Sequence, residues 1–102
     1  MNKKRTTTKT PDRSGWTFLS NHVHVLLCLH REGEDTVRVL ATKIGITERS
    51  VQRILSELEE AKAITRKRVG RCNIYKIRYS CKLRHPLEKK HTIGDLLGLL
   101  EN

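Results

Sequence analysis

Apolar residues between positions 37 and 58 recur three and four residues apart, which is the spacing of two consecutive amphipathic helices. The first helix face consists of Val37, Leu40, Ala41 and Ile44, and the second of Val51, Ile54, Leu55 and Leu58. Between the two sets, Gly45 supplies the left-handed conformation that ends a helix, and the Thr47 hydroxyl is placed to cap the next one. The pattern therefore predicts two helices joined by a tight turn, the second capped by Thr47.

The second of these helices carries hydrogen-bonding side chains on the face that points away from its apolar residues. Such side chains suit contacts with the edges of DNA bases. The expected base-contacting set is Thr47, Arg49, Ser50, Gln52, Arg53 and Ser56. Arg49 and Arg53 lie one turn apart and lead this set. The acidic residues Glu57, Glu59 and Glu60 would repel phosphates and are expected to be solvated. The pattern favours a helix-turn-helix that binds DNA over an ordinary helical hairpin that binds nothing.

A basic hairpin is predicted directly after the helix pair. A β-branched, basic stretch begins at Ile64, the turn falls on residues 70–73, and apolar and basic side chains then alternate up to Tyr79. The basic side chains on the hairpin or near its tip are Arg66, Lys67, Arg68 and Arg71. From there they would contact the phosphate backbone or the minor groove beside the second helix.

The flanking segments supply two further helices. A first helix over residues 16–31, capped by Ser14 or Thr17, is apolar nearly all round and therefore buried on more than one side. After a loop, residues 36–38 are expected to form a short strand. Thr92 caps a last helix that is too apolar to stand alone, so it covers the first helix or, as we prefer, pairs with its copy in a dimer. The expected dimer contacts are Leu26, Leu29, Ile93, Leu96, Leu97 and Leu100.

The predicted elements follow the order of a winged helix-turn-helix, a mainly α fold with a small β-hairpin. Their order is a helix, a short strand, the helix pair, the hairpin and a terminal helix. Residues 1–15 are expected to form a flexible basic arm, residues 16–84 the winged helix-turn-helix domain, and residues 85–102 the C-terminal helix.

Charge is distributed unevenly along this single-domain chain of 102 residues. Of the net charge of +10, residues 62–84 contribute nine basic and no acidic side chains, and residues 1–15 contribute five basic and one acidic. Such clustering marks a face that binds a polyanion. No apolar run approaches the roughly 20 residues of a membrane span. The polar N-terminus is unlike a secretory signal, so we expect a cytoplasmic, nucleoid-associated protein that does not contact membranes.

Catalysis and metal binding are not expected. His22 and His24 lie two residues apart on a helix and point to different faces. The three cysteines are an odd number without metal-site spacing, so the sequence predicts no disulfide framework, metal or cofactor. Cys72 lies between Arg71 and Asn73, where neighbouring cations favour the reactive thiolate. We hypothesise that its oxidation disturbs DNA contact; the alternative is an inert exposed thiol.

From residue 16 to residue 100 the chain resembles the small winged-helix bacterial transcription regulators of the MarR/ArsR kind. The resemblance rests on WTFLSNHVHVLLCL, on ITERSVQRILSELEEA followed by a basic hairpin with VGRCNIY, and on the closing HPLEKKHTIGDLLGLL. It implies a dimeric DNA-binding protein with residues 47–61 as recognition helix. Members of the MarR group usually have long helices at both ends that form the dimer and an effector pocket. Metal-sensing ArsR members carry cysteine pairs near the recognition helix, and this chain has none there.

The sequence therefore predicts a transcription regulator that binds specific double-stranded DNA, with no enzymatic activity and an unidentified effector. We expect a homodimer on a pseudo-palindromic site with half-sites about one helical turn apart. Each good bidentate base contact would contribute about 1–3 kcal/mol of discrimination. Two rival functions stay open: a protein-interaction module within a larger complex, and an RNA-binding winged helix that stacks bases on Tyr75 or Tyr79.

Overall fold

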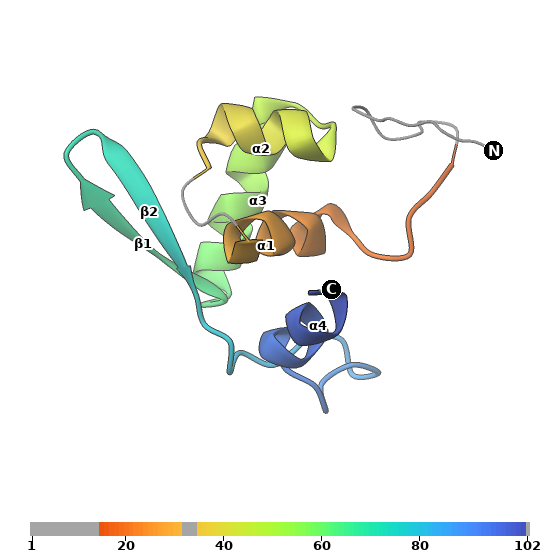
Figure 1. The fold of residues 1–102 in the computed structure, drawn as a ribbon. Helices are drawn as coiled ribbons and strands as arrows, with labels where there is room; N and C mark the ends of the chain where they lie inside the picture. The colour runs from red at the N-terminus through yellow and green to blue at the C-terminus, as the bar shows by residue number, and fades with distance from the viewer. Residues whose placement is uncertain (1–14, 32–34, 102) are drawn as a thin grey trace.

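The computed structural model describes residues 15–31 and 35–101. Along the described chain, helices precede and follow one two-stranded antiparallel sheet (Figure 1). The elements are α1 (Asn21–Arg31), α2 (Val37–Ile44), α3 (Glu48–Glu60), β1 (Ile64–Val69), β2 (Cys72–Ile77) and α4 (Ile93–Leu100). This order confirms the predicted winged helix-turn-helix, apart from the short strand expected before α2. The expected basic arm lies outside the described residues except for Gly15.

The turn between α2 and α3 has the predicted chemistry. The Gly45 backbone has a φ of 87°, in the left-handed region, and its N–H donates to the Ala41 carbonyl at 2.8 Å. Two residues later, the Thr47 hydroxyl accepts a hydrogen bond from the Ser50 N–H at 3.0 Å, so α3 begins at Glu48. These local bonds end one helix and start the next within three residues, which sets the direction in which α3 leaves the turn.

The prediction of a strand over residues 36–38 is wrong. The Thr36 hydroxyl accepts from the Val39 N–H at 3.2 Å, so Thr36 is an N-cap and α2 begins directly at Val37. A threonine in front of a helical apolar stripe gains this capping bond, which a strand would forgo. Val37 then packs against the hydrophobic core as a helical residue.

The first helix begins later than predicted. The N–H groups of Val23 and His24 donate to the Ser20 carbonyl at 3.1 and 3.2 Å, so α1 starts at Asn21 rather than at residue 16. Its end at Arg31 agrees with the prediction. Residues 32–34 of the expected loop lie outside the described part of the chain.

The segment before α1 explains why the helix does not extend further back. Trp16 and Phe18 are 76% and 91% exposed, with their rings packed edge to face at 4.7 Å between centroids. Short helices are held by packing, and these two side chains have no core to pack on. The Thr17 hydroxyl donates to the Leu19 carbonyl at 2.6 Å instead of capping a helix. Ser14, the other expected cap, lies outside the described residues.

The hairpin is tighter and shorter than predicted. Val69 lies opposite Cys72 in the ladder, which leaves a turn of only Gly70 and Arg71. Gly70 has a φ of 62°, a conformation that suits a two-residue hairpin turn. The turn expected over residues 70–73 is therefore two residues too long. The second strand, expected to run to Tyr79, ends two residues earlier.

A single hydrophobic core holds α3 in place. The most deeply buried side chains of the three-helix unit and the hairpin base are Val25, Leu40, Val51, Ile54 and Ile64. Within the described residues, every buried side chain is hydrophobic. Each valine, leucine or isoleucine among them contributes about 1.5–3 kcal/mol when fully buried. Because α3 packs against α1, α2 and β1, its inner face is fixed and its polar face is left outside.

The last helix, α4, packs against α1 and is anchored at its start (Figure 1). The Thr92 hydroxyl accepts from the Asp95 N–H at 3.1 Å, and the Asp95 carboxylate accepts from the Thr92 N–H at 3.0 Å. This backbone bond is the main reason why the pKa of Asp95 lies below its usual value. Gly94 allows a close approach, since a Cβ there would lie 3.0 Å from the Tyr79 carbonyl oxygen. Neither α4 nor any other described helix could cross a membrane.

The residues expected at a dimer contact fall into two groups. The group buried inside the chain itself is Leu26, Leu29, Ile93 and Leu97. These side chains are covered because α4 folds back against α1 within one chain. Leu96 and Leu100 are half-buried, and Leu99 beside them is 80% exposed. With α4 in this position, a second copy can contact α4 through these three leucines and not through the buried group.

Candidate nucleic-acid interface

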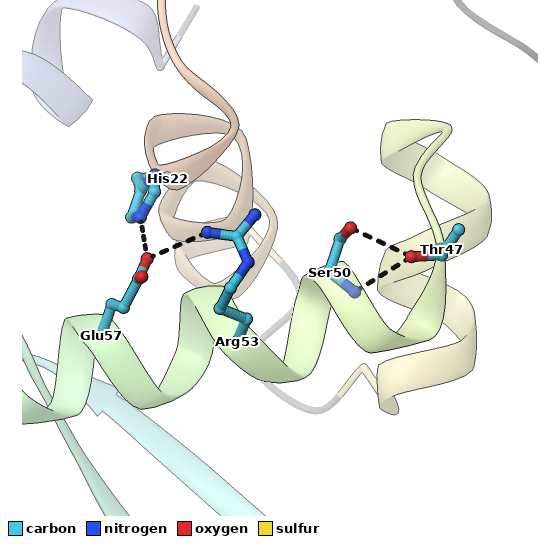
Figure 2. A network of polar contacts seen from close by, with 5 residues as sticks. All are labelled: His22, Thr47, Ser50, Arg53 and Glu57. Carbon is cyan, nitrogen blue, oxygen red and sulfur yellow. Dashed lines mark hydrogen bonds and ion pairs between the residues drawn. The ribbon is translucent and has the colours of Figure 1, made fainter.

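The outward face of α3 presents four of the six side chains expected to contact bases. These four exposed side chains are Arg49, Gln52, Arg53 and Ser56. The other two hold the start of the helix (Figure 2): the Thr47 hydroxyl donates to the Ser50 hydroxyl at 3.0 Å and accepts from the Ser50 N–H. The structure thus divides the expected set into four exposed polar side chains and two residues, Thr47 and Ser50, that cap the helix.

Arg53 is not a free side chain but part of a three-residue network (Figure 2). Its Nη1 lies 3.5 Å from Glu57 Oε1, one helical turn further along α3. The same carboxylate oxygen accepts a hydrogen bond from His22 Nε2 on α1 at 2.7 Å. Glu57 was expected to be solvated; it is only 44% exposed and links α3 to α1. The Arg53–Glu57 spacing was visible in the sequence, whereas the contact from α1 depends on the fold.

The network favours the ionised form of Glu57. The hydrogen bond from His22 is the largest cause that lowers the pKa of this carboxyl, and the positive charge of Arg53 lowers it further. His22 and Glu57 also line an open cavity of about 830 Å³ between α1, the end of α3 and the segment before α4. Arg53 must therefore leave an ionised partner before its guanidinium can bind any other group.

The hairpin projects beyond the helices (Figure 1). Its basic side chains are divided between its two faces by the alternation of the strands. The pairing register places Arg66 opposite Tyr75 and Lys67 opposite Ile74. Neighbouring residues of a strand point to opposite faces, so Lys67 lies on the face away from Arg66. Arg68 Nε donates to the Gly70 carbonyl at 3.2 Å, which folds this side chain onto the tip.

The Arg66 face of the hairpin is turned toward α3. Arg66 Nε lies 3.6 Å from Glu59 Oε2, and both side chains stay partly exposed. Glu59, like Glu57, was expected to be solvated. This ion pair connects α3 with the hairpin, and the sequence could not predict it because its partners lie on different elements.

The basic side chains of residues 62–84 lie on the surface. All nine of its lysine and arginine side chains are exposed. Lys62, just after α3, has a φ of 65°, which is unusual for a residue with a Cβ. Its carbonyl accepts from Arg78 Nη1 at 3.4 Å, so this strained residue lies where the hairpin base meets the end of α3.

The remaining candidate residues are placed as follows. Cys72 is exposed in β2, one residue past the turn, and forms no disulfide. Tyr75 is half-buried, whereas the Tyr79 hydroxyl is hydrogen-bonded to His30 Nδ1 at 2.9 Å, which ties it to α1. Across the described residues, no group of three or more His, Cys, Asp or Glu side chains could hold a metal ion.

Comparison with known proteins assigns the family. A model of the MarR family matches residues 16–71, which include α1, α2, α3, β1 and the hairpin turn. No curated protein and no solved structure matches the chain significantly. The matched region covers more than half of the 102 residues, and it includes α3, whose geometry is described above. The chain belongs to the MarR family of winged-helix, DNA-binding transcription regulators.

Proposed function

We propose that this protein binds specific duplex DNA sequences, with α3 in the major groove and the hairpin on the phosphate backbone or in the adjacent minor groove. The observation that carries the proposal is that exposed polar side chains of α3 lie beside the basic segment 62–84, whose nine lysine and arginine side chains are all exposed. A helix of this kind fits the major groove, where each base pair presents a distinct pattern of donors and acceptors.

Discrimination between sequences is assigned to α3. Arg49 and Gln52 lie on its first two turns, and their side chains suit bidentate contacts with guanine and adenine respectively. Arg53 can contact a base only after it releases the Glu57 carboxylate. Its net contribution to sequence discrimination is therefore smaller than that of Arg49. Ser56 is the last polar side chain of the row. Thr47 and Ser50 support the interface by fixing the helix start.

Affinity is assigned to the hairpin. Arg66, Lys67, Arg68 and Arg71 are all exposed, and Arg71 occupies the turn itself. Contacts from such side chains to phosphates hold a protein in register without selecting a sequence. They also make binding fall steeply with salt, because each neutralised phosphate releases counterions.

A homodimer is the form that we propose binds DNA. Leu99 is 80% exposed on α4, next to the half-buried Leu96 and Leu100, and together they offer an apolar edge to a second copy. A two-fold dimer would bind a pseudo-palindrome with half-sites about 34–36 Å apart, one turn of the duplex. Sedimentation equilibrium of wild type and Leu99→Glu tests this step, since the variant is expected to be monomeric.

Selection of bound sequences from a random duplex pool, at near-physiological salt, tests the proposal. An enriched motif with two-fold symmetry supports a dimeric, sequence-specific regulator. Binding without enrichment would show that the hairpin segment is only an electrostatic anchor, and it would favour a protein-interaction module. Preference for single-stranded RNA over every duplex would refute the proposal in favour of the RNA-binding alternative.

A further inference from the structure

A cleft of about 260 Å³ separates α3 from the hairpin. Most of its polar side chains can donate hydrogen bonds, whereas the carboxylate of Glu59 can only accept them. The donors that line the cleft are Gln52, Ser56, Arg66, Asn73 and Tyr75. The cleft is therefore rich in groups that bind an anion, and it already contains one anion of the protein itself.

We propose that this cleft binds a backbone phosphate of duplex DNA and that Glu59 competes for the same position in the free protein. The inference rests on the function proposed above. One sugar–phosphate strand separates the neighbouring major and minor grooves of a duplex. With α3 in one groove and the hairpin at the next, that strand passes between the two elements, where the cleft lies.

Two donors of the cleft are available for this contact. Asn73 and Tyr75 line the cleft and are not assigned to a base, and within the described residues their side chains have no hydrogen-bond or ion-pair partner. Binding a phosphate oxygen would therefore break no internal bond of theirs. Charge-assisted bonds from such donors to an anion are stronger than neutral ones.

Arg66 is the exception, because its guanidinium is engaged with Glu59. The two groups lie 3.6 Å apart, and Arg66 is 49% exposed, so a phosphate can approach the guanidinium from solvent. A bound phosphate would take over Arg66 and bring a second negative charge close to the Glu59 carboxylate. The like charges repel, so Glu59 lowers the affinity for every duplex, whatever its base sequence.

Glu59→Gln tests the proposal, with Glu88→Gln as the control. Both variants remove one negative charge, but Glu88 is exposed in the segment before α4 and does not line the cleft. Affinities are measured over a range of salt for the duplex selected from the random pool and for a scrambled duplex. Relative to the control, Glu59→Gln is expected to tighten binding to both by the same factor, about two- to five-fold. The slope of log K against log salt should become steeper by up to about 0.9.

A double-mutant cycle with Arg66→Gln isolates the competition. Arg66 is partly neutralised in the wild type, so Arg66→Gln should cost more affinity in the Glu59→Gln background than alone. On a single-stranded oligonucleotide of equal length, Glu59→Gln should match the control, because a single strand has no adjacent grooves. Thermal unfolding checks that the Glu59 and Arg66 variants remain folded. Both side chains are partly exposed, so their replacement should leave the core intact.

Three outcomes would overturn the proposal. If Glu59→Gln matches Glu88→Gln in affinity and slope while the wild type still discriminates the selected duplex, the cleft does not bind phosphate, although the proposed function stands. An equal gain on single strands would show general repulsion by Glu59 rather than a site. If the wild type binds no duplex, the proposed function fails together with the cleft.

Discussion

Leu97→Ala tests whether α4 is part of the folded domain rather than an appendage. Leu97 is 1% exposed, whereas Leu99, two residues further on the same helix, is 80% exposed. The two positions therefore allow the same substitution in opposite environments. If α4 packs on α1 as described, only the change at Leu97 removes buried apolar surface and leaves a cavity.

The expected cost follows from the burial of Leu97. Leucine-to-alanine changes in cores cost about 2–5 kcal/mol, and the lower half of this range applies here because α4 lies at the edge of the core, where neighbours can relax. A loss of about 2–3 kcal/mol is a large part of the 5–15 kcal/mol that stabilises a domain. It would lower the urea midpoint by about 1–2 M. Leu99→Ala should change the monomer by less than about 0.5 kcal/mol.

Urea unfolding followed by circular dichroism measures both variants, at low and at high protein concentration. A loss of stability for Leu99→Ala that appears only at high concentration would reveal the proposed dimer contact, since association stabilises by mass action. The reasoning is refuted if Leu97→Ala unfolds within about 0.5 kcal/mol of wild type at low concentration, because a side chain so deeply packed cannot be removed without cost.

Three further predictions concern single residues. Lys62 has a left-handed backbone, so Lys62→Gly should raise the free energy of unfolding by about 0.5–1 kcal/mol relative to Lys62→Ala, which removes the same charge; equal stability of the two would contradict the strain. Because the pKa of Glu57 is lowered in the folded protein, its ionised carboxylate contributes fully to the stability of the fold above the usual pKa of 4.5. This contribution is lost as the pH falls through the lower pKa of the folded state. The stability difference between wild type and Glu57→Gln should therefore shrink in acid urea titrations below pH 4.5, and a constant difference would refute it. If oxidation of Cys72 disturbs DNA contact, peroxide should weaken DNA binding by wild type but not by Cys72→Ser, and an equal response of both proteins would exclude this residue.

The helix pair was predictable because its determinants are local. Gly45 and Thr47 act within three residues of the chain, and the apolar stripes on each side need no knowledge of the rest of the fold. Thr36 carries the same capping signal, and the bond from the Val39 N–H makes it an N-cap rather than the start of a strand. At all three positions a local bond sets the helix boundary.

Contacts between elements could not be predicted from one sequence. His22 and Glu57 lie 35 residues apart in the chain, and only the packing of α1 on α3 brings them together. Charge type alone therefore suggested that the acidic residues of α3 are solvated, although Glu57 and Glu59 both form ion pairs with arginines. The start of α1 was missed for a similar reason, because apolar side chains such as Phe18 predict a helix only where a core exists to receive them.

The ratio of affinities for the selected and the scrambled duplex, measured in Arg49→Ala and Lys67→Ala, tests the central claim most directly. Arg49→Ala should lose about 1–3 kcal/mol, roughly 5- to 150-fold, on the selected duplex and little on the scrambled one. Lys67→Ala should weaken binding to both equally and reduce the salt slope by about 0.9. An equal loss on every sequence for both variants would contradict the assignment of base contacts to α3 and phosphate contacts to the hairpin.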